Sequence, residues 1–174
     1  NRTVGFRCAQ SAGAPLAGAL SPARAAHFLG THFFSPASRM ALVEVIPGPD
    51  TAEGVVESVL GLLREVGKEP IRVKDVAGFA VNRVLHAFLI EATRLVEEGV
   101  VSAADLDTAC RQGLGHPVGP LQLMDITGNH LNLEVQNILK DAYGERFRPR
   151  PNLERLVAEG KLGRRTGKGW HDYG

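Results

Sequence analysis

The sequence predicts a mainly α fold, in which five or six helices follow two or three β-strands. Over most of residues 51–159 the apolar residues recur every three or four positions, which is the period of an amphipathic helix. Before residue 50, two short apolar runs rich in β-branched and aromatic residues end at prolines, as strands do. The 174 residues are 44% hydrophobic and 22% charged, which is the composition of one globular domain with at most a fragment of another.

The two predicted strands lie at residues 26–34 and 41–46. A third run, residues 70–75, alternates apolar and charged residues and predicts either a lesser strand or an extended connector. An isolated pair of strands is only marginally stable in water. We therefore expect these strands to complete a sheet whose other strands are missing from this chain, or to pair with another copy of it.

Helix signals follow the second strand. A first helix is expected at residues 51–66, after Asp50 and Thr51 at the cap position, and a second carries a wide apolar stripe from residue 79 and ends at Gly99. A third opens with Ser102 as N-cap and Asp105 three residues later, a shortened capping box. The remaining helical segments are residues 121–126 and 131–143, interrupted near Gly128, and residues 151–159.

Charge and composition exclude several classes of function. The net charge is only +1, which gives no electrostatic argument for binding nucleic acid. The two cysteines, Cys8 and Cys110, form neither a disulfide framework nor a zinc spacing, and the histidines lack metal-ligand spacing, so we expect a cytoplasmic protein without a metal site. No apolar run reaches the roughly 18 residues that span a bilayer, so we expect no membrane insertion.

Three side chains are suited to chemistry. His32 lies at the end of an aromatic strand and titrates near neutrality, so it can remove a proton from an alcohol and return it. Glu44 lies in an apolar strand, where a carboxylate is costly to bury without a partner, and a nearby imidazole would be one. Asn82 lies early in an amphipathic helix. Spacing alone also permits the plainer interpretation that all three are surface or capping residues.

Several motifs carry a family resemblance. They are His32–Pro36 (His-Phe-Phe-Ser-Pro), Met40–Ile46, Asp75–Arg83, the glycine and proline turn Gly113–Pro120, and Lys161–Trp170. In this order they resemble the NAD-dependent L-3-hydroxyacyl-CoA dehydrogenases, which include the 3-hydroxybutyryl-CoA enzymes. The resemblance implies a helical C-terminal dehydrogenase domain like that of 6-phosphogluconate dehydrogenase, preceded by the last strands of a truncated Rossmann domain. Residues 1–48 would be the remnant of the dinucleotide-binding domain and residues 49–174 the helical substrate and dimerisation domain.

The resemblance also implies an activity. It is the NAD-dependent oxidation of L-3-hydroxyacyl-CoA to 3-ketoacyl-CoA in fatty-acid metabolism, by a homodimer that binds an acyl-CoA substrate. It assigns roles to six residues: His32 as catalytic base, Glu44 as its orienting carboxylate, Asn82, Ser35 and Ser11 as substrate-binding residues, and Arg165 as a cofactor-binding residue. Arg165 stands where the family usually has lysine; it keeps the cation but presents it with a different geometry.

The sequence departs from the family pattern at three places. Ser35 replaces the usual asparagine of the His-Phe-Phe-Asn-Pro motif. The upstream serine of the family falls on Ser11 when residues are counted without gaps, but on Ala14 when the next leucine is aligned with Leu16. The Gly-x-Gly-x-x-Gly turn that seats the pyrophosphate of the cofactor does not occur, so we expect the isolated chain to be inactive.

Two alternatives stay open. One is a helical dimerisation module that has lost catalysis, and the other is a related dehydrogenase that acts on a sugar acid or a free β-hydroxy acid. The first alternative gives no reason for His32 and Glu44 to lie within hydrogen-bond reach of each other.

Overall fold

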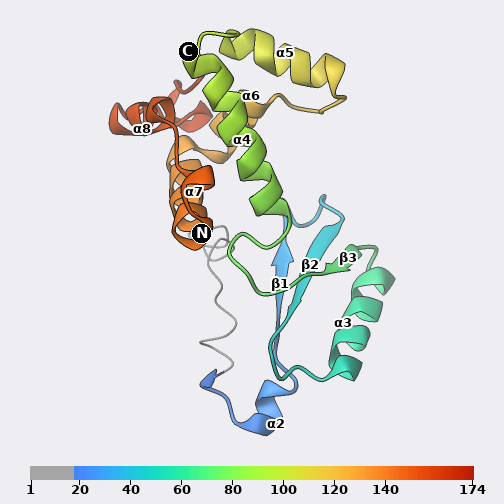
Figure 1. Cartoon of the computed structure of the whole chain (residues 1–174). Helices are drawn as coiled ribbons and strands as arrows, with labels where there is room; N and C mark the ends of the chain where they lie inside the picture. The colour runs from blue at the N-terminus through green and yellow to red at the C-terminus, as the bar shows by residue number, and fades with distance from the viewer. Residues whose placement is uncertain (1–17) are drawn as a thin grey trace. The chain divides into compact units, whose positions relative to one another are not determined.

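The computed structural model describes residues 18–174 of the chain (Figure 1). The chain divides into two compact units, one ending at Ala80 and the other beginning at Val81, which we call the sheet unit and the helical unit. This division comes later than the predicted one after Gly48, because the helix and strand that follow Gly48 pack on the strand before it.

The sheet unit holds a three-stranded sheet and the helix that packs on it. Its elements are the short helix α2 (Pro22–Ala25), β1 (Leu29–Phe33), β2 (Leu42–Pro47), α3 (Glu53–Glu65) and β3 (Glu69–Arg72). The strand order is β1-β2-β3, with β1 antiparallel and β3 parallel to β2. A parallel pair needs a crossover connection, and α3 provides it between β2 and β3. One prediction is corrected here, because the first strand begins only at Leu29. The run near residue 70 is a strand, which was one of its two predicted alternatives.

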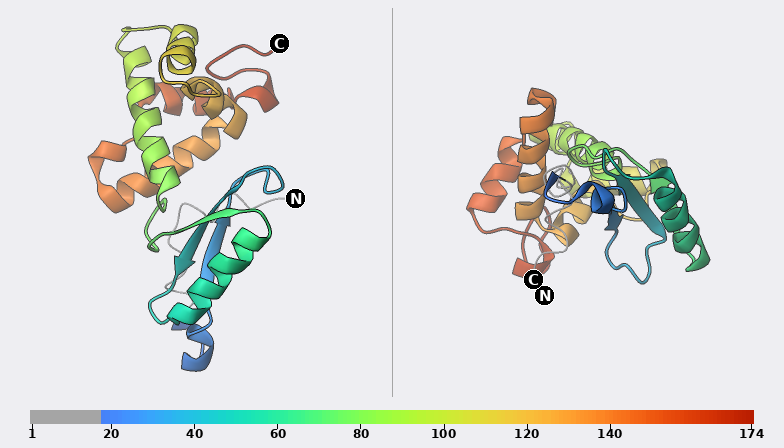
Figure 2. Two further views of the ribbon diagram at one scale, coloured as in Figure 1. Left: turned by 90° about the vertical axis from the view of Figure 1, so that its right-hand side faces the viewer. Right: turned by 90° about the horizontal axis from the view of Figure 1, so that it is seen from below.

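Alternation along β2 gives the sheet two different faces. Val43 and Val45 are fully buried and form an apolar core with Val56, Leu60 and Leu63 of α3, so α3 covers this face (Figure 2). Successive side chains of a strand point to opposite faces. Glu44, between the two valines, therefore points to the face that α3 does not cover.

Of two helix N-caps predicted from the sequence, the structure confirms the one at Ser102 and contradicts the one at Asp50 and Thr51. Ser102 is the N-cap of its helix, and its hydroxyl accepts a hydrogen bond from the Asp105 N–H at 3.1 Å, as predicted. The cap predicted at Asp50 and Thr51 is wrong, because Ala52 is the N-cap residue and makes no side-chain cap. The Thr51 hydroxyl instead accepts the Gly48 N–H at 2.7 Å and donates to the Phe28 carbonyl, so it ties the end of β2 to the start of β1.

The helical unit confirms the predicted helices. It contains α4 (Val81–Glu97), α5 (Ala103–Gly113), α6 (Pro120–Thr127), α7 (Asn129–Tyr143), α8 (Pro151–Ala158) and the 3₁₀ turns η2 (Glu145–Phe147) and η3 (Arg164–Thr166) (Figure 1). Its core draws on four helices, α4, α5, α6 and α8, and is formed by Leu89, Ala92, Leu106, Cys110, Leu121, Met124 and Leu153. Gly128, with a φ of 101°, separates α6 from α7 where the interruption was predicted. None of the helices in residues 18–174 is long and apolar enough to cross a membrane.

A buried carboxylate holds the C-terminal tail on the helical unit. Asp125 of α6 is 1% exposed and accepts hydrogen bonds from the Trp170 N–H, the His171 N–H, the Tyr173 hydroxyl and the Asn129 amide, at 2.9 to 3.0 Å. Burial, together with the charge and hydrogen bond of Asp125, raises the pKa of Tyr173 to about 12. The tail is therefore a packed part of the unit, anchored through one side chain.

Stability should fall on acidification because of one buried histidine. His86 of α4 is 4% exposed, and burial lowers its pKa from 6.5 to about 4. Between these values the unfolded chain takes up a proton at His86 that the folded chain does not, so the free energy of unfolding falls as pH falls. His86→Leu should make unfolding by urea less dependent on pH in this window, whereas His130→Leu, at an exposed position of α7, should change the dependence little. An unchanged pH dependence in His86→Leu would contradict the assignment.

Candidate active site

The antiparallel register of β1 and β2 brings His32 and Glu44 together. They are directly opposite partners across the two strands, so both side chains lie on the same face of the sheet. The His32 Nδ1 lies 2.7 Å from the Glu44 Oε2. His32 is 8% exposed and Glu44 is fully buried. A slip of one residue in the register would turn the two side chains to opposite faces.

Hydrogen bonding defines the proton arrangement of this pair. When Glu44 is ionised its oxygens only accept, so the tautomer that fits this contact has the proton on Nδ1 of His32, and this N–H donates a hydrogen bond to Oε2 of Glu44. The other carboxylate oxygen, Oε1, accepts the backbone N–H of Ala80 at 3.0 Å. In a neutral imidazole Nε2 is then the unprotonated nitrogen, the form that a general base requires. The arrangement can take a proton at Nε2 and stabilise the resulting imidazolium through Glu44.

Two aromatic rings lie against the imidazole. The Phe34 ring centroid is 4.5 Å from that of His32, and the Phe79 centroid is 5.7 Å away, with both rings tilted by about 45°. Phe79 has a φ of 44°, and no other residue except glycine has a positive φ within residues 18–174. A left-handed backbone costs about 1–2 kcal/mol for a residue with a side chain, and such strain is typical of functional sites.

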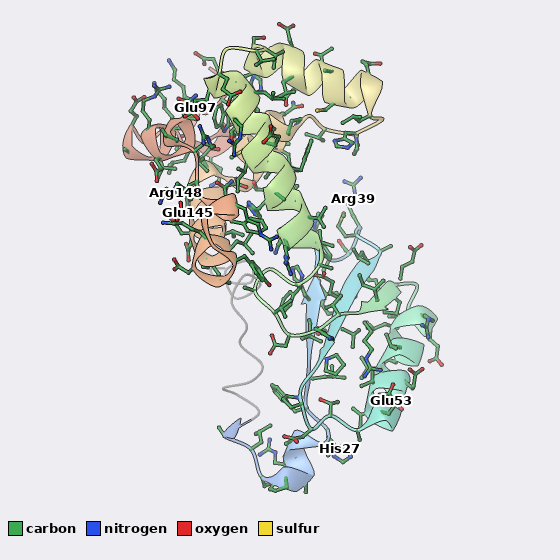
Figure 3. The ribbon with its side chains drawn as sticks, in the orientation of Figure 1. His27, Arg39, Glu53, Glu97, Glu145 and Arg148 are labelled. Atoms are coloured by element: carbon green, nitrogen blue, oxygen red, sulfur yellow. The ribbon has the colours of Figure 1, made fainter. Side chains whose placement is uncertain are left out.

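The connection between β1 and β2, residues 34–41, is held by Lys68. Its ammonium donates to the carbonyl oxygens of Ala37 and Met40, at 2.5 and 2.9 Å. Ser35 lies in this connection, three residues after His32, and is exposed. Figure 3 shows Arg39 at the tip of the connection, with its side chain extending away from the strands.

The helical unit carries the other predicted site residues. Asn82 is the second residue of α4, is half-buried, and follows Ala80 by two positions in the chain. Arg165 lies in η3 and is exposed. It lines a cavity of about 260 Å³ together with Asp125, Ile126, Gly128, His130, Leu162 and Thr166. Ser11 lies outside the described residues.

Two contacts of the pair are not predicted by the sequence: Phe79 as a neighbour of His32, and the Ala80 N–H as a donor to Glu44. The sequence places a glycine, Gly78, directly before them, which is a signal for a turn. It does not reveal that the phenylalanine itself adopts a left-handed conformation, because that conformation is rare for any bulky residue. A backbone donor also leaves no mark in the sequence, because every residue except proline has one.

Two family profiles together match nearly all of the described chain. Residues 16–76 match the profile described as 3-hydroxyacyl-CoA dehydrogenase, NAD binding domain, and residues 78–173 match the profile described as 3-hydroxyacyl-CoA dehydrogenase, C-terminal domain. The point where the two matches meet agrees with the division of the structure after Ala80. The first profile covers the strands that carry His32 and Glu44, and the second covers Asn82 and Arg165.

Individual proteins that the chain resembles are also named as hydroxyacyl-CoA or hydroxybutyryl-CoA dehydrogenases. The chain is 41% identical over 152 residues to the mitochondrial hydroxyacyl-coenzyme A dehydrogenase of Sus scrofa, and the match covers 84% of this chain and 47% of that protein. It is 37% identical to a probable 3-hydroxybutyryl-CoA dehydrogenase of Deinococcus radiodurans, over 89% of this chain and 56% of that protein. The crystal structure of (S)-3-hydroxybutyryl-CoA dehydrogenase PaaH1 from Ralstonia eutropha matches with a TM-score of 0.87 and 39% identity, covering 92% of this chain and 56% of that one.

The chain thus spans about half the length of the curated relatives it matches. Its two profile matches follow each other in the order of a single dehydrogenase, with the NAD-binding profile first. On this evidence the chain belongs to the 3-hydroxyacyl-CoA dehydrogenase family, a family of oxidoreductases.

Proposed function

We propose that this chain forms the substrate side of an NAD-dependent L-3-hydroxyacyl-CoA dehydrogenase that acts in fatty-acid metabolism, including β-oxidation. The observation that carries the proposal is the hydrogen bond of 2.7 Å between His32 and the fully buried Glu44. Burying a carboxylate is costly, and here the cost is offset by a histidine and a backbone amide. This is the arrangement that proton abstraction from an alcohol requires.

The chemistry follows from the proton arrangement. The 3-hydroxyl of the substrate would give its proton to Nε2 of His32 as the C3–H bond breaks. The imidazolium that forms would be stabilised by Glu44, which holds Nδ1 throughout. Bound NAD would accept the hydride that leaves C3. In the opposite direction the same imidazolium returns its proton to the developing alkoxide.

The residues present fit only a part of the cofactor. The side chain of Arg165 borders a cavity in the helical unit and can attract an anionic dinucleotide. The sequence contains no Gly-x-Gly-x-x-Gly turn to seat the pyrophosphate, so that contact has to come from residues beyond this sequence. We therefore assign Arg165 an accessory contact with NAD and expect tight cofactor binding only when a nucleotide-binding half is joined to the chain.

Substrate contacts are proposed for Asn82, Ser35 and Ser11. The amide of Asn82 would donate a hydrogen bond to the substrate oxygen or to the thioester region of the acyl-CoA. Ser35 is exposed in the connection that follows His32, and its hydroxyl can bind a polar group of the substrate at shorter reach than asparagine. Ser11 would act in the same way as the upstream serine of the family.

A homodimer is the second part of the proposal. Several large apolar residues of the helical unit are exposed, namely Val84, Val100, Leu114 and Ile126. Val84 is 72% exposed on α4, which favours a partner surface over solvent at that helix. Sedimentation equilibrium should give twice the mass of the chain; the mass of a monomer at all concentrations would contradict this part.

A cytoplasmic location also remains a prediction, and some relatives are named as mitochondrial.

The test compares the chain alone with the chain joined to a nucleotide-binding half, such as that of the Ralstonia eutropha relative. Oxidation of NADH should depend on acetoacetyl-CoA in the joined polypeptide and be absent from the chain alone. Acetoacetate and a keto-sugar acid serve as controls for the alternative substrate classes. A joined polypeptide that folds and binds NADH but reduces none of the three would favour the non-catalytic dimerisation module.

A further inference from the structure

One turn of the sheet unit contacts both members of the acid–base pair. It comprises Gly78, Phe79 and Ala80, which follow β3 and precede α4. The Ala80 N–H donates to Oε1 of Glu44 at 3.0 Å. The ring of Phe79, one residue earlier, lies 5.7 Å from the imidazole of His32. Two consecutive residues therefore contact the pair: Ala80 binds Oε1 of Glu44, and Phe79 lies against the imidazole of His32.

The backbone of this turn explains how it does both. Gly78 has a φ of 73° and Phe79 a φ of 44°, so two successive residues are left-handed. The Phe79 N–H donates to the Val76 carbonyl at 3.0 Å and closes the turn. In this conformation the ring of Phe79 and the next N–H both reach the face of the sheet that carries the pair. If Phe79 were extended, the peptide plane between Phe79 and Ala80 would rotate. The Phe79 ring and the Ala80 N–H would then point in other directions than they do here.

We propose that Phe79 is a positioning residue for the pair, acting through its left-handed backbone as well as through its ring. Glu44 has one oxygen on His32 and the other on Ala80, so the Ala80 N–H fixes the rotation of the carboxylate and thereby the plane of the imidazole. Phe79 sets the direction of that N–H. The inference rests on the proposed function only in calling the pair an acid–base pair; the geometry itself can be measured without substrate or cofactor.

The experiment is nuclear magnetic resonance on this chain with ¹⁵N-labelled histidine and backbone. The Nδ1–H signal of His32 is identified by its loss in His32→Gln, and solvent exchange is measured there and at the Ala80 N–H. Phe79→Gly removes the ring and frees the backbone, so both protons should exchange about tenfold faster. Phe79→Leu keeps a side chain and a restricted backbone, so the increase should be smaller at both protons.

Phe34→Leu is the matched control. Phe34 also contacts the imidazole, at 4.5 Å, but its backbone does not direct the Ala80 N–H. It should alter the chemical shifts of the His32 ring and leave the exchange of the Ala80 N–H as in the wild type. Equal exchange of Ala80 in Phe34→Leu and Phe79→Gly would overturn the proposal, because the effect would then come from ring packing alone.

Two further outcomes separate this inference from the proposed function. If Phe79→Gly and Phe79→Leu leave both protons as protected as in the wild type, Phe79 has no positioning role, while the pair and the proposed activity stand. If the wild-type chain shows no hydrogen-bonded Nδ1–H at His32, the pair is not formed and both proposals fail. Far-ultraviolet circular dichroism of each variant establishes that it is folded before exchange is compared.

Discussion

His32→Gln is expected to lower kcat of the joined dehydrogenase by about 10²- to 10⁴-fold, the contribution typical of a general base. Glutamine can still donate a hydrogen bond to Glu44, which keeps the buried carboxylate paired, but its amide takes up no proton near neutral pH. The fold should therefore survive while proton transfer is lost. The measurement is the steady-state reduction of acetoacetyl-CoA by NADH, with kcat and KM determined separately.

His27→Gln is the control for this variant. His27 is an exposed histidine of the same unit, and its Nδ1 lies 2.9 Å from the Ala23 carbonyl, close to α2 (Figure 3). We expect its kcat and KM to match those of the unmodified enzyme. A normal kcat in His32→Gln would remove the catalytic assignment. A loss of kcat accompanied by a large fall in the melting temperature would show that His32 is needed for folding instead.

Asp125→Ala is expected to lower the free energy of unfolding of the chain by about 3–5 kcal/mol, because four donors lose a charged acceptor in a buried place. Two backbone N–H groups of the tail, the Tyr173 hydroxyl and the Asn129 amide all depend on this carboxylate. The tail should detach from α6, and its bonds should become sensitive to protease. Urea denaturation measures the loss, and limited proteolysis locates it.

Asp141→Ala is the matched substitution at an exposed position of α7, and it should change the free energy of unfolding by less than about 0.5 kcal/mol. A second variant tests the contact between Asp125 and the tail by changing a residue of the tail. A Cβ on Gly169 would lie 1.9 Å from Oδ1 of Asp125, so Gly169→Ala has to displace the tail or the carboxylate. Asp125→Ala with a stability equal to that of Asp141→Ala would show that solvent replaces the carboxylate without cost.

The elements most fully predicted from the sequence are those with a strong apolar period. The wide stripe beginning near residue 79 predicts α4, and the short run at residues 41–46 predicts β2. Thr51 was misassigned because a threonine hydroxyl also binds backbone groups outside helices, and here it joins Gly48 to Phe28. The predicted boundary after Gly48 differs from the observed division after Ala80, because β3 pairs with β2 and so joins residues 49–80 to the sheet unit. The sequence pattern of a strand does not show which other strand it pairs with.

The candidate site was predicted in part. A carboxylate in an apolar strand needs a partner, and on this ground the sequence predicts that Glu44 pairs with a nearby imidazole such as that of His32. The contributions of Phe79 and Ala80 lie beyond such reasoning, because they depend on one backbone angle and on a main-chain N–H. The roles of Asn82, Ser35, Ser11 and Arg165 rest on the resemblance and stay predictions.

The alternation of β2 has a consequence for redesigning this protein. A shift of β2 by one residue would turn Val43 and Val45 away from α3 and expose them to solvent, and the same shift would turn Glu44 away from His32. The burial of the two valines therefore also stabilises the orientation of Glu44. Residues 37–40 contribute nothing to this apolar core, so substitutions in that part of the connection should leave the geometry of the His32–Glu44 pair in place. The register of the hairpin and the composition of its connection can therefore be altered separately.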